Sequence, residues 1–223
     1  VSEFAEGNTG LTETVCRILA DAGNKAPVVL SSSTQAALDN PYGVSKREAE
    51  NALLEHGKST GAPVYVYRLT NVFGKWSRPN YNSAVATFCH NIARGLPIQI
   101  NDPAAPVTLV YVDDVVERFI ELMDGADAAV DAEGFATVTP QYTTTVGEIA
   151  GRIETFRASR DTLVTERVGT GLVRALYSTY VSYLPPERFA YPVPMHGDAR
   201  GVFVEMLKTP DCGQFSFFTD RKS

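Results

Sequence analysis

The stretch VVLSSS at residues 28–33, followed by PYGVSK at residues 41–46, decides the fold of this 223-residue chain. A short apolar run that ends in hydroxyls is typical of a buried parallel strand, which delivers its last side chains to the carboxyl edge of a sheet. Tyr42 and Lys46 are four residues apart, so on a helix they lie on one face, one turn apart. We therefore expect hydroxyl, phenol and ammonium groups to lie close together at one edge of an α/β sheet.

These three groups are suited to proton transfer. An ammonium beside a phenol favours the phenolate electrostatically, so the phenol can exchange its proton closer to neutral pH. The Tyr-x-x-x-Lys spacing also occurs by chance on helix surfaces. The strand that ends in serines just upstream is therefore an essential part of the hypothesis.

Three ordered segments resemble the extended short-chain dehydrogenase/reductase family, the NAD(P)-dependent nucleotide-sugar epimerases, dehydratases and reductases. They are SSS at 31–33 with YGVSK at 42–46, RLTNVFG at 68–74 and YVDDVV at 111–116. The resemblance implies a partial Rossmann-like parallel α/β sheet with helices on both faces and a small substrate subdomain.

Finer matches resemble one branch of the family, the capsular-polysaccharide reductases that carry a C-terminal cupin domain. They are NPYG at 40–43, GKW at 74–76, PNYNS at 79–83, ATFC at 86–89 and YSTY at 177–180. The stretches 197–205 and 214–219 are similar to the opening of that cupin. This branch implies a homodimer that uses NADPH to reduce a UDP-4-keto-6-deoxy-N-acetylhexosamine to UDP-N-acetyl-6-deoxy-L-talosamine. A cytoplasmic location is expected because Cys16, Cys89 and Cys212 are odd in number and unpaired by spacing.

Two alternatives stay open. One is an epimerase or dehydratase that uses the same triad with tightly held NAD, although TQA at 34–36 offers no acid/base carboxylate after the serines. The other is a non-catalytic binding or assembly piece. The preference for NAD or NADP stays open as well. The glycine loop and the residues that contact the adenosine ribose, which would distinguish the two cofactors, are not found in this sequence.

The resemblance also implies site residues. The catalytic set is Ser33, Tyr42 and Lys46; the cofactor set is Ser31, Tyr42, Lys46 and Leu69; and the substrate set is Ser33, Asn71, Lys75, Arg78 and Asn82. In this assignment Tyr42 protonates the reduced carbonyl and Lys46 holds the nicotinamide ribose. Ser33, with Thr34 as the alternative, hydrogen-bonds the substrate oxygen, unless its hydroxyl merely satisfies backbone at the strand end.

Other polar residues have structural interpretations as well. Asn71 either fixes a sugar or phosphate oxygen or forms an Asx-turn, and Arg68 is expected in a buried structural ion pair. Asp113 and Asp114 resemble an active-site carboxylate pair, but aspartates at a helix start are usually caps and dipole partners.

The diphosphate of the substrate needs cations. The family often carries an arginine just before its Tyr-Val-x-Asp segment, where this chain has Thr108 and Leu109. Lys75 and Arg78 are therefore expected to take that role.

The predicted domain organisation is a partial NAD(P)-binding domain with its substrate subdomain over 1–165, a linker with a helix over 166–188, and the start of a truncated cupin over 189–223. No Gly-x-x-Gly-x-x-Gly follows an apolar strand. The GNTG at 7–10 instead suggests a helix start, with Asn8 and Thr9 as N-caps and Glu13 completing a capping box. The cupin metal site is expected beyond this sequence.

Composition narrows the classes of partner. The formal net charge is −6 and basic residues are scattered, which gives nucleic-acid binding little support. With 44% hydrophobic residues the chain can bury a sizeable core, yet no apolar run approaches a membrane span. Cys16 and Cys89 are expected as small core hydrophobes, and three widely spaced histidines indicate no metal site.

The remaining pattern alternates strands and helices. Helices are predicted over 9–22, 42–57, 83–94, 113–123, 146–158 and 170–182, and strands over 27–33, 64–69 and 136–138, with two short extended pieces within 96–110. Gly95 is a predicted helix C-cap and Thr145 a predicted N-cap. Residues 189–219 alternate like strands with one buried face, so they should be disordered, pack on the α/β body, or pair with a second chain.

Overall fold

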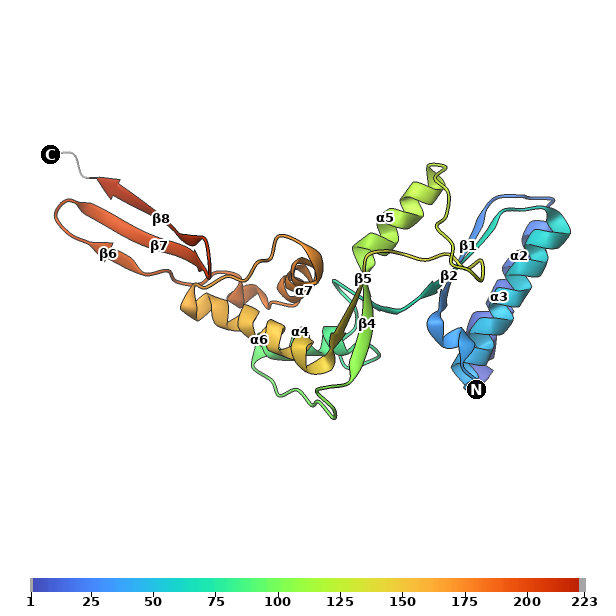
Figure 1. Cartoon of the computed structure of the whole chain (residues 1–223), viewed down its shortest axis with the longest axis horizontal. Helices are drawn as coiled ribbons and strands as arrows, with labels where there is room; N and C mark the ends of the chain where they lie inside the picture. Colours follow the sequence, from blue (N-terminus) through green and yellow to red (C-terminus); the bar gives the residue numbers. More distant parts are fainter. Residues whose placement is uncertain (1, 221–223) are drawn as a thin grey trace. The chain divides into compact units, whose positions relative to one another are not determined.

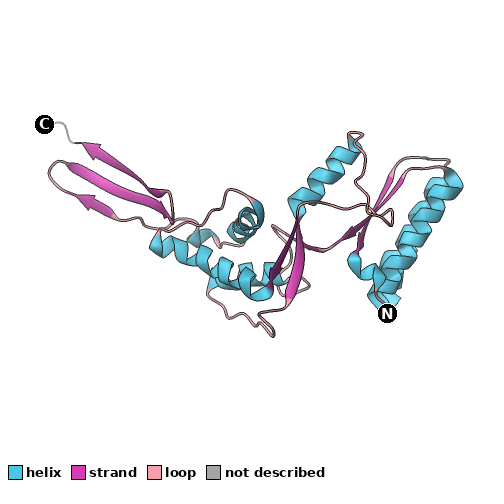
Figure 2. Cartoon of the chain, viewed as in Figure 1, coloured by secondary structure: helices cyan, strands magenta, loops and turns pink. Residues whose placement is uncertain are grey.

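The computed structural model describes residues 2–220, which form two compact units. The first unit combines the residues up to Thr70 with Asp113–Gln141, and the second combines Asn71–Val112 with the residues from Tyr142 onward. Figure 1 labels most helices and strands of both, and Figure 2 distinguishes helices from strands.

The first unit contains the predicted serine strand and the Tyr/Lys helix. Its elements are α1 (Ser2–Phe4), η1 (Ala5–Gly10), α2 (Leu11–Asp21), β1 (Val28–Ser33), η2 (Thr34–Ala37), α3 (Pro41–Thr60), β2 (Val64–Leu69) and most of α5 (Val112–Met123). The strands β1 and β2 are parallel, with Val28 opposite Val64 and Ser33 opposite Leu69. The predicted strands 27–33 and 64–69 and their parallel pairing are confirmed.

Helices cover both faces of this pair of strands. Successive side chains of a strand point to opposite faces, and Val66 packs with Cys16 of α2 and Leu53 of α3. The next residue, Tyr67, places its ring 5.0 Å from that of Phe119 in α5. The two sides of β2 therefore meet different helices, as the Rossmann-like resemblance implies.

The start of α3 is defined by its cap and its packing. The Asn40 side chain accepts a hydrogen bond from the Gly43 N–H at 2.8 Å, and Pro41 occupies the first helical turn. Gly43 has no room for a side chain, because a Cβ there would lie 2.3 Å from the Gln35 carbonyl oxygen and 2.5 Å from that of Leu38. This close approach seats η2 against the turn that carries Tyr42.

The predicted N-caps of the first long helix are wrong. The backbone is already helical before Leu11, because α1 and the π-helical turn η1 lead directly into α2. Asn8 instead donates to the Ser45 hydroxyl at 3.0 Å, and Thr9 donates to the Glu48 carboxylate at 3.2 Å. These side chains therefore attach η1 to α3 rather than cap α2.

The second unit holds a three-stranded sheet, in the order β3-β4-β5, and a helical layer. Its elements are β3 (Asn71–Phe73), α4 (Ala84–Arg94), β4 (Pro106–Tyr111), β5 (Gln141–Thr145), α6 (Val146–Thr162), α7 (Gly171–Ser182), η3 (Pro186–Arg188), β6 (Met195–Gly197), β7 (Gly201–Thr209) and β8 (Gly213–Asp220). The helices α4, α6 and α7 pack on one another, and their buried side chains form one apolar core with those of β3 and β4. Residues 166–188, predicted as a linker with a helix, thus contribute α7 to this core.

Helix caps in the second unit confirm the sequence signals. Gly95 ends α4 with a left-handed φ of 70°, and Thr145 and Glu148 form a complete capping box at the start of α6. The helix α6 runs four residues further than predicted, to Thr162.

Two strand predictions in this region need correction. Within 96–110 the structure has one strand, β4, rather than two extended pieces, and Ala136 makes only isolated bridges, to Tyr67 and Val130. The strand β5 was not predicted, because its sequence QYTTT lacks an apolar alternation. The pairing partner in the sheet, rather than local pattern, therefore defines this strand.

The last three strands form an antiparallel sheet in the order β6-β7-β8. The backbone of Lys208 in β7 exchanges hydrogen bonds with the segment that follows α6, with Leu163 at 2.7 Å and with Thr165 at 2.8 Å. Val204 is buried, whereas every residue of β8 is exposed. The contacts of β7 agree with the expected packing within the chain, whereas the buried face expected for residues 214–219 is not found in β8. Pairing with a second chain stays a prediction, as do the domain boundaries.

Candidate active site

The three serines at the end of β1 have different environments. Ser32 is buried and donates to the Glu50 carboxylate at 2.5 Å, whereas Ser31 and Ser33 lie on the opposite face of the strand. The Ser31 carbonyl oxygen accepts a hydrogen bond from the Lys46 ammonium at 3.3 Å. The carboxyl end of β1 is thus joined to α3 through the Ser32 side chain and through the Ser31 backbone carbonyl.

Ser33 occupies the turn between β1 and η2. Its hydroxyl oxygen accepts a hydrogen bond from the Gln35 N–H at 3.2 Å, which is the structural role that the sequence left open. A hydroxyl that accepts one bond keeps its own hydrogen for donation. The half-buried Ser33 can therefore still donate to a substrate oxygen, and this role stays a prediction.

Tyr42 and Lys46 lie on successive turns of α3. The Lys46 Nζ is 5.8 Å from the centre of the Tyr42 ring, and the Phe4 ring meets the same tyrosine edge-on at 5.6 Å. Partial burial lowers the pKa of Lys46, and the nearby Glu50 carboxylate opposes that change. A phenol and a cationic amine therefore lie together beside the serine strand, as the spacing predicts.

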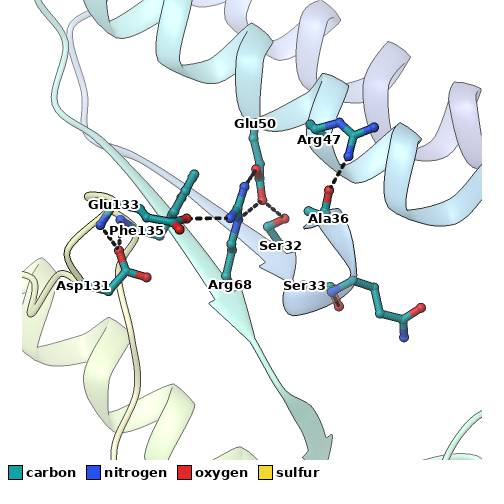
Figure 3. Close-up of polar contacts among 10 residues, drawn as sticks. Ser32, Ser33, Ala36, Arg47, Glu50, Arg68, Asp131, Glu133 and Phe135 are labelled. Carbon is teal, nitrogen blue, oxygen red and sulfur yellow. Dashed lines mark hydrogen bonds and ion pairs between the residues drawn. The ribbon is translucent and has the colours of Figure 1, made fainter. Parts of the chain in front are cut away.

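The predicted role of Arg68 as a buried structural pair is confirmed. Its guanidinium donates to the two Glu50 oxygens at 3.1 and 2.8 Å, and to Glu133 at 3.3 Å (Figure 3). The same group lies 3.5 Å from the centre of the Phe135 ring. Its hydrogen bonds to Glu50 raise the pKa of Arg68 above its ordinary value.

The residues of the first unit fit one end of a nicotinamide cofactor. Lys46 has three N–H donors and uses one on Ser31, so donors remain for ribose hydroxyls beside the Tyr42 phenol. Leu69, predicted to contact the cofactor, is opposite Ser33 in the strand register. Neither β1 nor β2 leads into a glycine-rich turn, so the described residues offer no such cradle for a pyrophosphate.

The remaining predicted substrate residues belong to the second unit. The Asn71 side chain donates to the Thr108 carbonyl oxygen at 3.0 Å, which ties β3 to β4 in place of the Asx-turn. Asn82 is exposed and lines a cavity of about 450 Å³ together with Asn80, Gln99 and Asn101. Substrate contacts by Asn71 and Asn82 stay predictions.

Lys75 and Arg78 each lie near an aromatic ring. The Lys75 Nζ is 5.6 Å from the Trp76 ring and 5.9 Å from the Tyr111 ring, and the Arg78 guanidinium is 5.4 Å from the Tyr81 ring. These residues are the cations that were predicted to meet a diphosphate, and that role stays a prediction.

Sequence reasoning did not single out Glu50 or Arg174. Glu50 continues the four-residue spacing of Tyr42 and Lys46, which was a usable signal. Arg174 lies in α7, in the least periodic part of the sequence, and its guanidinium is 5.9 Å from the Tyr111 ring that Lys75 also approaches. That arginine comes near Tyr111 only because α7 packs into the core of the second unit.

Comparison with known proteins identifies the family. The sequence profile of the NAD dependent epimerase/dehydratase family matches residues 2–136, which include the serine strand and α3. This chain belongs to that family. The family name implies a nicotinamide cofactor, in agreement with the donors beside Tyr42.

The chain is 58% identical over 218 residues to the UDP-2-acetamido-2,6-beta-L-arabino-hexul-4-ose reductase of Pseudomonas aeruginosa (strain PA103). The match covers 97% of this chain and 58% of that reductase. The crystal structure of the capsular polysaccharide assembling protein CapF from Staphylococcus aureus has a TM-score of 0.87 at 43% identity, over 92% of this chain and 55% of CapF. The chain thus spans little more than half the length of these relatives.

A more distant structure shares the fold. The UDP-glucose 4-epimerase of Thermus thermophilus, solved with NAD, has a TM-score of 0.61 at 17% identity, over 77% of this chain and 68% of the epimerase. This likeness supports the Rossmann-like α/β class. Among residues 2–220, no helix combines the length and apolar character needed to cross a membrane.

Proposed function

We propose that the full-length protein containing this chain is an NADPH-dependent reductase of a UDP-4-keto-6-deoxy-N-acetylhexosamine. Its product would be UDP-N-acetyl-6-deoxy-L-talosamine, a precursor for capsular or O-antigen polysaccharide. The observation that carries the proposal is the Tyr42 and Lys46 pair beside the serine strand, in a chain 58% identical to a reductase of this sugar class. A cytoplasmic homodimer is part of the same proposal.

The side chains of the first unit have distinct roles in this reaction. When bound, reduced nicotinamide supplies the hydride that adds to the carbonyl carbon C4 of the sugar. Tyr42 gives its phenolic proton to the carbonyl oxygen, and the Ser33 hydroxyl hydrogen-bonds that oxygen while negative charge develops on it. The Lys46 ammonium holds the ribose hydroxyls and stabilises the phenolate that remains.

Four polar side chains are the proposed contacts to the nucleotide. Lys75 and Arg78 provide positive charge for the diphosphate in a chain whose formal net charge is −6. Asn71 and Asn82 provide side-chain amides suited to sugar and phosphate oxygens. Ser31 and Leu69 would contact the cofactor at the end of the paired strands.

Reduction is favoured over dehydration by the residues that follow the serines. The η2 turn carries Thr34, Gln35 and Ala36, none of which is a carboxylate that could act as an acid or base. An epimerase or dehydratase with bound NAD remains the second candidate, because the family includes such enzymes. A purely binding or assembly role is the third.

The test supplies the full-length protein with the UDP-4-keto-6-deoxy sugar and either NADPH or NADH. The proposal predicts stoichiometric loss of the reduced-nicotinamide absorbance, faster with NADPH, and a product with a hydroxyl at C4. Turnover of the sugar without net consumption of reduced nicotinamide would identify an epimerase or dehydratase instead. Calorimetric binding of UDP-sugar with no turnover would support a binding role.

A further inference from the structure

We propose that Glu50 is a positioning residue of this proton-transfer site. Its buried carboxylate fixes the carboxyl ends of β1 and β2 and places a negative charge one helical turn from Lys46. The inference rests on the proposed function for the identity of the reaction. The contacts that carry it all lie within the first unit.

The carboxylate is almost completely enclosed and fully engaged. The Glu50 side chain is 2% exposed, and it accepts one hydrogen bond from Ser32 and two from Arg68. A buried carboxylate is costly unless such donors compensate it. Figure 3 shows Glu50 reaching from α3 to Ser32 on β1 and Arg68 on β2. One side chain therefore connects three elements.

These contacts hold the residues that carry the chemistry. Ser32 and Arg68 are opposite each other in the strand register, one step before Ser33 and Leu69. Ser32 also directly follows Ser31, whose carbonyl oxygen binds the Lys46 ammonium. Because Glu50 binds both residues of this pair, it fixes the position of the carboxyl ends of β1 and β2 relative to α3. A displacement of about 1 Å at reacting groups can reduce a rate about 100-fold.

Glu50 also acts on Lys46 through its charge. The groups found near the Lys46 ammonium are the Ser31 carbonyl on β1 and, on α3 itself, Tyr42 and Glu50. Arg68 on β2 is hydrogen-bonded to Glu50. Burial lowers the pKa of Lys46, and Glu50 opposes this. Neutralising Glu50 should lower that pKa further, so Lys46 would lose its proton at a lower pH.

The alternative is that Glu50 only stabilises the fold by pairing with Arg68. In that case its loss would lower stability without changing the titration of Lys46 or the chemical step of the folded protein. Three variants of the full-length protein separate these possibilities. Glu50→Gln removes the charge at nearly constant shape, and Glu55→Gln makes the same change at an exposed site on the same helix.

The third variant, Glu50→Gln/Arg68→Met, keeps the test informative if Glu50→Gln does not fold. It removes the guanidinium that Glu50→Gln leaves without its carboxylate, and apolar replacement of a buried ion pair is often tolerated. For each variant we would measure melting temperature, and kcat and KM with NADPH and the UDP-4-keto-6-deoxy sugar. The titration of Lys46 is measured separately by NMR, without substrate or cofactor, on protein whose lysines carry carbon-13 methyl groups. The Lys46 signal is assigned as the one that is lost in Lys46→Arg.

We expect kcat to fall about 10- to 100-fold in Glu50→Gln and in the folded double variant, with KM for the sugar changed less than about threefold. The fall of kcat at high pH and the titration of Lys46 should both move to lower pH in these variants. Glu55→Gln should match the wild type in both measurements. Wild-type kcat and an unmoved Lys46 titration in either folded variant would overturn the proposal. If the wild type itself does not reduce the sugar, the proposed function fails, and the Lys46 titration still tests Glu50.

Discussion

Tyr42, Lys46 and Glu50 follow one another at four-residue intervals on α3, so one face of a single helix carries the proposed proton donor, the cation and the buried carboxylate. The first two could be predicted from their spacing and from the serines upstream. The spacing also marks Glu50, but its contacts could not be predicted, because its partner Arg68 is 18 residues away and comes opposite Ser32 only through the strand register. Local sequence therefore indicates the proposed reactive groups but not the contacts of the residue that we propose to position them.

Replacing Tyr42 with phenylalanine keeps the ring and removes the proton donor. In the full-length protein we expect Tyr42→Phe to lower kcat by about 10²- to 10⁴-fold and to leave substrate binding little changed. Steady-state kinetics with NADPH and the 4-keto sugar measure this. Tyr81→Phe, at an exposed tyrosine, is the matched control. A near-normal kcat in Tyr42→Phe would mean that the likeness to the family extends to the fold only.

Gly43 is the residue at which packing leaves least freedom near the site. We expect Gly43→Ala to destabilise the protein by about 1–3 kcal/mol, because the added methyl group would meet two backbone carbonyl oxygens that cannot move aside easily. Chemical denaturation measures this. Gly151→Ala is the control: it is also helical, a methyl group added there would meet nothing within 4 Å, and the change should be neutral or stabilising. Equal stabilities would contradict the close packing of η2 on α3.

Among the elements, those with their own local signal were predicted and those that depend on a distant partner were not. β1, β2 and α4 have clear apolar runs or periodicity with capping residues, and their predicted positions agree with the structure within a residue or two. β5 has neither, and it exists because β4 offers a sheet edge. The start of α2 was misplaced because Asn8 and Thr9 have capping side chains but use them on α3.

The capping box of α6 gives a prediction at this scale. Thr145→Ala removes the hydroxyl that accepts the Glu148 N–H, so it should lower the free energy of unfolding by about 1 kcal/mol. Thr155→Ala on the same helix is the control, since its hydroxyl donates only to the preceding turn. Thermal denaturation compares the two, and an equal loss of stability in both variants would argue against the cap.

At the scale of the whole molecule, the chain has two units with separate cores and spans little more than half of its relatives. The predicted reactive groups belong to the first unit, and the predicted diphosphate cations belong to the second. The family predicted from sequence resemblance is confirmed, and the roles of both sets of residues stay predictions. The resemblance did not predict that the supposed linker contributes a helix to the second core, because apolar side chains in a weakly periodic segment do not indicate their partners.

The 223-residue chain alone should bind NADPH weakly. Tyr42 and Lys46 are proposed to hold the ribose of the nicotinamide, but β1 and β2 in the described residues lead into no glycine-rich turn for the pyrophosphate. Isothermal titration with NADPH measures this directly, with the full-length protein as the reference. Sub-micromolar binding by the 223-residue chain would show that its own residues form a complete cofactor site.

The most direct test of the central claim follows the hydride itself. The full-length protein is supplied with NADPH that carries deuterium at the transferable position of its nicotinamide ring, together with the UDP-4-keto-6-deoxy sugar, and the product is read by NMR. Our account predicts one deuterium at C4 of a UDP-N-acetyl-6-deoxy-talosamine, formed at a far lower rate by Tyr42→Phe. A sugar product without deuterium at C4, or one formed equally fast by Tyr42→Phe, would contradict it.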